Sequence, residues 1–146
     1  MQIKAANREN FTAKQRKLSD IAYLVVHYTG NRGDTAKNNA DYFAREVTGT
    51  SAHYFVDERE VWQSVQDNHA AWHCGTKGTY YHPACRNANS IGVEVCMLDK
   101  HGKLRQGSVD RAAPDKMIKR FASMCEQAYN RITAKEETRA STSGRR

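Results

Sequence analysis

The apolar segment IAYLVVHY, residues 21–28, constrains the fold more than any other part of the sequence. Its β-branched and aromatic side chains favour a strand, and a continuous apolar run of this length is typical of a buried one. A single histidine, His27, lies near the end of the run, directly before the loop that begins at Thr29. Loops at strand ends carry the sites of many α/β folds, although a single strand histidine is more often a core residue. His27 is therefore a candidate functional residue.

Regular elements are expected along most of the chain. Apolar patterns predict strands at residues 21–28, 52–58, 60–66 and 90–98, and helical spacing predicts helices at about 35–47 and 109–129. Asp34 or Thr35 can cap the first helix, because a short polar side chain accepts a hydrogen bond from the first turn. The second and third strands are separated by a tight turn and are expected to form a hairpin. This mixture predicts an α/β fold, with a mixed β-sheet flanked by helices.

The chain of 146 residues is long enough for a single domain with a substantial core. We expect a polar N-terminal arm over residues 1–20, the domain over residues 21–130, and a polar tail over residues 131–146. No segment approaches the ~18 consecutive apolar residues of a membrane helix, so no membrane partner is expected. The first twenty residues lack the apolar core of a secretory signal peptide, which predicts a protein that stays cytoplasmic until it is released.

Glu94 is the second candidate functional residue. It lies inside the apolar segment SIGVEVCML, where strand alternation places it on one face with Gly92 and Cys96. A buried carboxylate must be paired, bound to a metal or neutral, and burial raises its pKa toward the range of a general base or acid. The alternative is a solvent-exposed face of a one-sided strand. A face of glycine, glutamate and cysteine favours the floor of a site instead.

Residues 67–89 form a long segment without periodicity that contains glycine, histidine and aromatic residues. Loops of this length in compact domains are usually functional or disordered, and aromatic side chains suit a groove for sugars or peptides. Four cysteines stand at 74, 85, 96 and 125, and no CxxC pair suggests a zinc ribbon. Cys74 and Cys85 flank a glycine- and tyrosine-rich loop and can form a disulfide after export, whereas four free thiols are expected inside a cell.

The net charge of +7 favours polyanionic partners. Nucleic acid and the anionic polymers of the bacterial wall are the two candidates. No basic cluster is interleaved with aromatic residues as in single-strand binders, so we expect no specific nucleic-acid partner.

Four motifs, taken in order, resemble one enzyme family. The segments YLVVHYTGN, SAHYFVDE with EVWQSV, AAWHCG and NSIGVEVCM occur at spacings similar to those of the zinc-dependent N-acetylmuramoyl-L-alanine amidases. This family includes phage and prophage endolysins, bacterial wall amidases and peptidoglycan recognition proteins. The resemblance covers residues 20–113 and implies a single amidase-like domain.

The resemblance implies a peptidoglycan hydrolase that cuts the amide between N-acetylmuramic acid and L-alanine of the stem peptide. It also implies one Zn²⁺ ion as cofactor, with His27 as the first zinc ligand. Glu94 matches a strand glutamate that acts as the general base in many members. We expect a monomer that acts at the bacterial cell wall.

Substrate binding is expected to involve four further residues. Trp72 and His73 match a loop that lines the substrate groove in the family. His53 and Tyr54 lie in the motif SAHYFVDE, and a structural or supporting role for His53 is an alternative to direct contact.

One feature of the family is missing from this sequence. Members carry two further zinc ligands near the C-terminus, a histidine and then a cysteine or aspartate, whereas no histidine follows His101 here. The alternative function is therefore an inactive, C-terminally truncated relative that binds peptidoglycan without cleaving it.

Overall fold

The computed structural model describes residues 1–13, 16–75, 80, 82–113 and 116. Met1–Pro114 belong to one compact unit, and nearly all of the second unit, Asp115–Arg146, lies outside the described residues. Most of the helix predicted at 109–129 and the whole predicted tail at 131–146 therefore also lie outside them. The predicted domain limits of 21–130 stay a prediction.

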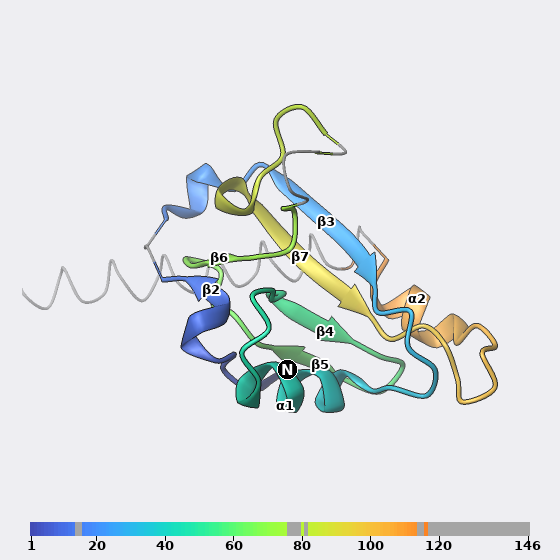
Figure 1. The fold of residues 1–146 in the computed structure, drawn as a ribbon. Helices are drawn as coiled ribbons and strands as arrows, with labels where there is room; N and C mark the ends of the chain where they lie inside the picture. The colour runs from blue at the N-terminus through green and yellow to red at the C-terminus, as the bar shows by residue number, and fades with distance from the viewer. Residues whose placement is uncertain (14–15, 76–79, 81, 114–115, 117–146) are drawn as a thin grey trace, which may run out of the picture. The chain divides into compact units, whose positions relative to one another are not determined.

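A five-stranded mixed sheet forms the centre of the first unit (Figure 1). β4 and β5 are antiparallel and form the predicted hairpin, whereas the other three neighbouring pairs are parallel. The prediction of an α/β fold with a mixed sheet is confirmed. In spatial order the strands are β1 (Gln2–Ile3), β5 (Val61–Gln63), β4 (Tyr54–Val56), β7 (Ser90–Val95) and β3 (Tyr23–Tyr28).

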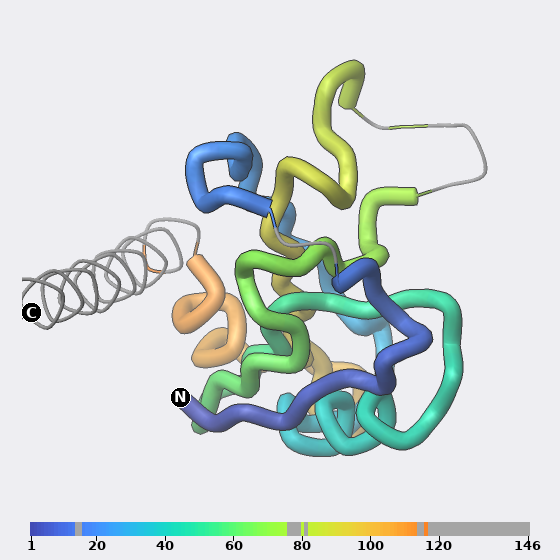
Figure 2. Tube along the Cα trace, turned by 90° about the vertical axis from the view of Figure 1, so that its left-hand side faces the viewer, coloured from blue at the N-terminus to red at the C-terminus, as the bar shows by residue number. Residues whose placement is uncertain are grey.

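The N-terminal segment packs onto the domain rather than extending from it as an arm. β1 adds a parallel edge strand beside β5, and Figure 2 shows the first residues running next to that strand. After the 3-10 helix η1 (Arg8–Asn10), β2 (Phe11–Thr12) pairs with β6 (Ala70–Ala71) in a small antiparallel sheet. Asn10 anchors the segment, because its fully buried side chain accepts hydrogen bonds from the backbone N–H groups of Thr48 and Gly49.

Helix α1 (Ala36–Arg45) covers β4 and β5. Thr35 is its cap, with Oγ1 accepting a hydrogen bond from the N–H of Asn38 at 3.0 Å. Its buried alanines, Ala36 and Ala40, pack with Phe55 of β4 in a core cluster. The helix ends at Arg45, two residues before the predicted end.

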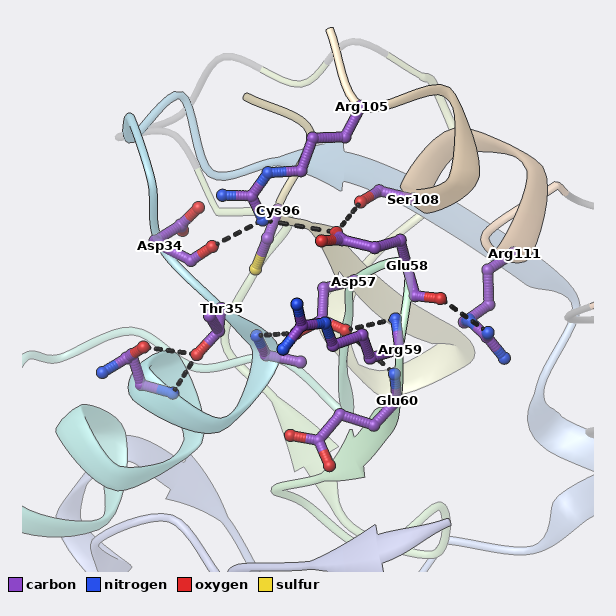
Figure 3. Close-up of polar contacts among 12 residues, drawn as sticks. Asp34, Thr35, Asp57, Glu58, Arg59, Glu60, Cys96, Arg105, Ser108 and Arg111 are labelled. Atoms are coloured by element: carbon purple, nitrogen blue, oxygen red, sulfur yellow. Dashed lines mark hydrogen bonds and ion pairs between the residues drawn. The ribbon is translucent and has the colours of Figure 1, made fainter. Parts of the chain in front are cut away.

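A polar network joins the start of α1, the β4–β5 turn and helix α2 (Gln106–Arg111), as Figure 3 shows. The carboxylate of Glu58, in the turn, accepts a hydrogen bond from Ser108 Oγ at 3.1 Å and lies 3.4 Å from Arg105 Nη1. The same Arg105 nitrogen donates to the carbonyl of Asp34 at 2.9 Å. α2 begins three residues earlier than predicted. No helix in the described ranges is long and apolar enough to cross a membrane.

Replacing Asp57 with alanine should destabilise the fold by about 2–3 kcal/mol, because removal of this buried carboxylate leaves the N–H groups that donate to it without an acceptor. Asp57 is only 3% exposed, and its carboxylate accepts hydrogen bonds from the N–H groups of Ala36, Arg59 and Glu60 at 2.8–2.9 Å. Urea unfolding measures the effect as a lower midpoint at unchanged slope. Asp41→Ala is the control and should change the midpoint little, because the partly exposed Asp41 carboxylate forms only weak surface ion pairs with Lys4 and Lys37 among the described residues. Equal midpoints for the two variants would contradict the anchoring role.

Candidate functional site

His27 and Glu94 lie side by side on neighbouring parallel strands. His27 of β3 is in register with Glu94 of β7, which is in register with Phe55 of β4. Residues paired in this way point to the same face of a sheet. Phe55 is covered by α1, whereas His27 and Glu94 are only partly buried. The two predicted functional residues therefore occupy the part of this face that α1 leaves accessible.

His73 lies against β7 at the position that Gly92 leaves open. A Cβ atom built on Gly92 would be 2.5 Å from Cγ and 2.7 Å from Nδ1 of the His73 ring. The backbone of Gly92 is held by His53, with Gly92 N–H donating to His53 Nδ1 and His53 N–H donating to Gly92 O, both at 3.0 Å. Glycine is thus the only residue type at position 92 that leaves room for the His73 ring in its observed place.

A chain of hydrogen bonds determines the tautomer of His27. The Ser90 hydroxyl donates to the carbonyl of Arg86 at 2.7 Å, so its oxygen accepts from His73 Nε2–H at 3.0 Å. Burial, with smaller effects from the His27 and Arg16 charges, lowers the pKa of His73 to about 3, so the ring is neutral at pH 7. Its Nδ1 must then accept from His27 Nε2–H, also at 3.0 Å.

The lone pair of His27 is consequently on Nδ1. Burial lowers the pKa of His27 as well, which keeps the imidazole neutral and able to bind a metal. A neutral imidazole whose other nitrogen is fixed by a hydrogen bond is the usual form of a histidine metal ligand.

Glu94 has the protonation behaviour expected of a general base. Burial, with a smaller contribution from the negative charge of Asp34, raises its pKa to about 7. A carboxyl group with this pKa exchanges protons readily near neutral pH.

A cavity of about 240 Å³ adjoins His27 and His73. Its wall is completed by residues of β3 and of the long loop, which are Val25, Cys74, Tyr80, His82 and Cys85. This arrangement brings the long loop to the same site as His27, as the aromatic composition of that loop suggested.

The described residues do not complete a zinc site. Among them, no group of three or more His, Cys, Asp or Glu side chains is arranged to hold a metal ion. His27 offers one suitable nitrogen, and the protein sequence contains no histidine after His101. The donor set near His27 in this part of the chain therefore does not fit a zinc ion with three protein ligands.

Two residues that we expected to bind substrate lie beneath the surface instead. His53 is 0% exposed, and its Nε2 lies 2.9 Å from Arg16 Nη2 and 3.0 Å from the carbonyl of His69. Tyr54 is 2% exposed and its hydroxyl donates to the Asp67 carboxylate at 2.7 Å. Both side chains are therefore buried and hydrogen-bonded within the protein, which sequence alternation alone does not reveal, and their role in substrate binding stays a prediction. For His53 this agrees with the alternative supporting role.

Trp72 is partly exposed and borders a second, larger cavity of about 480 Å³ with Thr12, Arg16 and Asn87. Its indole N–H donates to Thr12 Oγ1 at 2.8 Å. Trp72 and His73 thus line two cavities rather than one.

Sequence reasoning did not find Ser90 and Asp34 as contributors to the site. Ser90 precedes Gly92 and Glu94 in the same alternation, so extending that pattern by one step would have identified it. Asp34 was considered only as a helix cap, and its influence on Glu94 depends on the tertiary fold.

Replacing Asp34 with asparagine should lower the pKa of Glu94 below about 7, because a nearby negative charge is removed while burial remains. The asparagine oxygen can still accept the hydrogen bond that Asp34 receives from Asn39. Titration of the Glu94 carboxyl carbon by NMR measures the shift. Asp41→Asn should leave this pKa unchanged, because the shift of Glu94 comes from burial and Asp34. An unaltered Glu94 pKa in Asp34→Asn would contradict the electrostatic coupling.

The chain is similar in sequence to known N-acetylmuramoyl-L-alanine amidases. The chain is 34% identical over 111 residues to the N-acetylmuramoyl-L-alanine amidase CwlL of Bacillus licheniformis, a match that covers 70% of this chain and 31% of that protein. It is 36% identical over 93 residues to CwlA of Bacillus subtilis strain 168, which covers 62% of this chain and 31% of that protein. The matches thus span about a third of the length of these relatives.

Solved structures show the same fold. The catalytic domain of XlyA superposes with a TM-score of 0.66 at 25% identity, covering 86% of this chain and 76% of that one. A mutant endolysin from Bacillus subtilis gives a TM-score of 0.61 at 26% identity, covering 76% and 68%. The family model described as N-acetylmuramoyl-L-alanine amidase matches residues 17–143, well beyond the four motifs. The chain therefore belongs to the N-acetylmuramoyl-L-alanine amidase family.

Proposed function

We propose that this chain hydrolyses the amide bond between N-acetylmuramic acid and L-alanine of the peptidoglycan stem peptide. Family membership supports the substrate and the reaction class. The observation that carries the proposal is the in-register pair of His27 and Glu94 on the accessible part of the sheet face, with a Glu94 pKa of about 7.

Glu94 acts as the general base in this proposal. Its carboxylate accepts a proton from the attacking water and then returns it to the nitrogen of the leaving L-alanine amine. A group with a pKa near 7 is suited to both transfers, because it is substantially deprotonated at neutral pH and still a competent acid afterwards. Trp72 and His73, which border the two cavities, bind the glycan or peptide on either side of the scissile bond.

We further infer that the cofactor is one zinc ion with His27 Nδ1 as a ligand. The hydrogen bond from His27 Nε2 to His73 leaves that nitrogen available. Because the described residues supply an incomplete donor set, completion of the site depends on residues beyond them. Elemental analysis of chelator-washed, zinc-reloaded protein tests this directly. A zinc ratio near one supports it, and a ratio well below one contradicts it.

The same incomplete donor set favours a second candidate function, which is binding of peptidoglycan without cleavage. In this case the grooves beside Trp72 and His73 hold the muropeptide, and the positively charged chain remains on the anionic wall. Under both proposals the chain is a monomer that acts at the bacterial cell wall after release from the cytoplasm.

Incubation with purified peptidoglycan distinguishes the two functions. Hydrolysis should release L-alanine amino groups in proportion to enzyme, and a chelator should abolish the release. Co-sedimentation with the wall without any release of amino groups would reject the hydrolase and support the binding protein. Absence of both release and co-sedimentation would reject both proposals.

A further inference from the structure

The side chains of Cys74 and Cys85 meet in the wall of the cavity beside His27. Their sulfur atoms are 3.9 Å apart, and both residues are free thiols. Cys85 is 8% exposed, whereas Cys74 is more accessible. Cys96 is fully buried elsewhere, where its sulfur accepts a hydrogen bond from Asn39. Cys74 and Cys85 are thus a contacting pair, and Cys96 is a natural control.

The backbone holds both cysteines in place. Asn87 Oδ1 accepts hydrogen bonds from the N–H groups of His73 and Cys74 at 3.0 and 2.7 Å. The N–H of Cys85 donates to His82 Nδ1 at 3.1 Å, and its carbonyl accepts from Arg86 Nη1 at 2.7 Å. The sulfurs are already in contact at 3.9 Å, so a disulfide, with an S–S distance of about 2.05 Å, requires a further approach of about 1.9 Å.

We propose that Cys74 and Cys85 are a thiol–disulfide couple that reacts with low-molecular-weight disulfides. The Cys74 thiolate attacks the external disulfide, whose S–S bond breaks, and one small thiolate leaves. The Cys85 thiolate then attacks the Cys74 sulfur of the mixed disulfide, the second small thiolate leaves, and the Cys74–Cys85 bond forms. The protein loses two electrons and two protons, and the external disulfide is reduced to two thiols.

Oxidation of this pair changes the surroundings of His73. The Cys74 sulfur lies 3.3 Å from His73 Nδ1, the same nitrogen that accepts from His27 Nε2 at 3.0 Å. The Cys74 thiol therefore lies beside the hydrogen bond between His27 and His73, and oxidation replaces its S–H with a sulfur that carries no hydrogen. It also closes a ring over residues 74–85, which restricts the unfolded chain.

Treatment of the full-length protein with excess oxidised glutathione tests the couple. Burial raises the pKa of the Cys74 thiol, so the exchange is followed to its end rather than for a fixed short time. We expect loss of two hydrogens by mass spectrometry and a cross-linked peptide that joins Cys74 to Cys85. The melting temperature should rise by about 5–10 °C relative to the reduced protein. Dithiothreitol should reverse both changes.

Three variants make the outcome specific. Cys74→Ser and Cys85→Ser should each lose the oxidation-dependent rise in melting temperature, and Cys96→Ser should retain it. Comparing oxidised with reduced protein within each variant removes any effect of the substitution on stability. A persistent glutathione adduct, a bridge that includes Cys96 or Cys125, or full-length protein that remains reduced would each overturn the proposal.

Discussion

Replacing Glu94 with glutamine is expected to reduce amide hydrolysis by about 10²–10⁴-fold while peptidoglycan binding stays nearly intact. Glutamine has almost the same size and fits the same position on β7, but its amide does not accept a proton from water. The measurement is the initial rate of L-alanine amine release, compared with co-sedimentation of the same variant with purified wall. Glu46→Gln is the matched control, since the Glu46 carboxylate pairs with its neighbour Arg45 outside the site.

The pH dependence of the wild-type reaction is a second test of the role of Glu94. A general base works when deprotonated, so the rate should rise as the pH increases through about 7, the pKa of Glu94. In Asp34→Asn this rise should begin at lower pH. A wild-type rate in Glu94→Gln would reject the base role, and an equal loss of turnover and binding would make Glu94 a structural residue.

Replacing Gly92 with alanine is expected to lower activity by about 10²-fold, because a displacement of roughly an ångström in a side chain that positions the site has an effect of this size. The new methyl group would lie 2.5 Å from the His73 ring, and the two hydrogen bonds between Gly92 and His53 prevent the strand from moving away. His73 must therefore shift and weaken its hydrogen bond to His27 Nε2. The loss is measured as the rate of L-alanine amine release.

Gly75→Ala is the control for this prediction, because a Cβ atom there meets nothing closer than 3.9 Å. Overpacking at Gly92 should also cost about 1–3 kcal/mol of stability, so thermal unfolding is used to choose a temperature at which both variants are fully folded. Activity of Gly92→Ala equal to that of Gly75→Ala at this temperature would show that the position of His73 does not matter.

The sequence was sufficient to identify the strands that carry His27 and Glu94, because both residues stand in apolar runs rich in β-branched side chains. It was not sufficient to show that these strands are neighbours. His27 and Glu94 are far apart in the chain, and their pairing depends on the parallel alignment of β3 with β7. Only the resemblance to the amidase motifs indicated that His27 and Glu94 belong to one site, because the periodicity of each strand says nothing about its neighbours.

Other features of the fold have no local pattern in the sequence from which they could be predicted. β1 consists of Gln2 and Ile3 alone, and a two-residue strand is too short to show alternation. The burial of His53 and Tyr54 likewise depends on distant partners, since Arg16 and Asp67 occupy their polar atoms. The proximity of Cys74 and Cys85 was one of two alternatives from the sequence, and tertiary structure was needed to bring their sulfurs together.

Among the described strands, β3 lies at the edge of the sheet and is hydrogen-bonded along one side only, to β7. Its outer residues Val26 and Tyr28 are 43% and 64% exposed, so little apolar burial opposes separation of this strand. Local opening of β3 would remove His27 from Glu94 while β4, β5 and α1 stay folded. Hydrogen exchange should therefore be faster in β3 than in β4, and the integrity of the site should be lost at lower denaturant concentration than the rest of the fold.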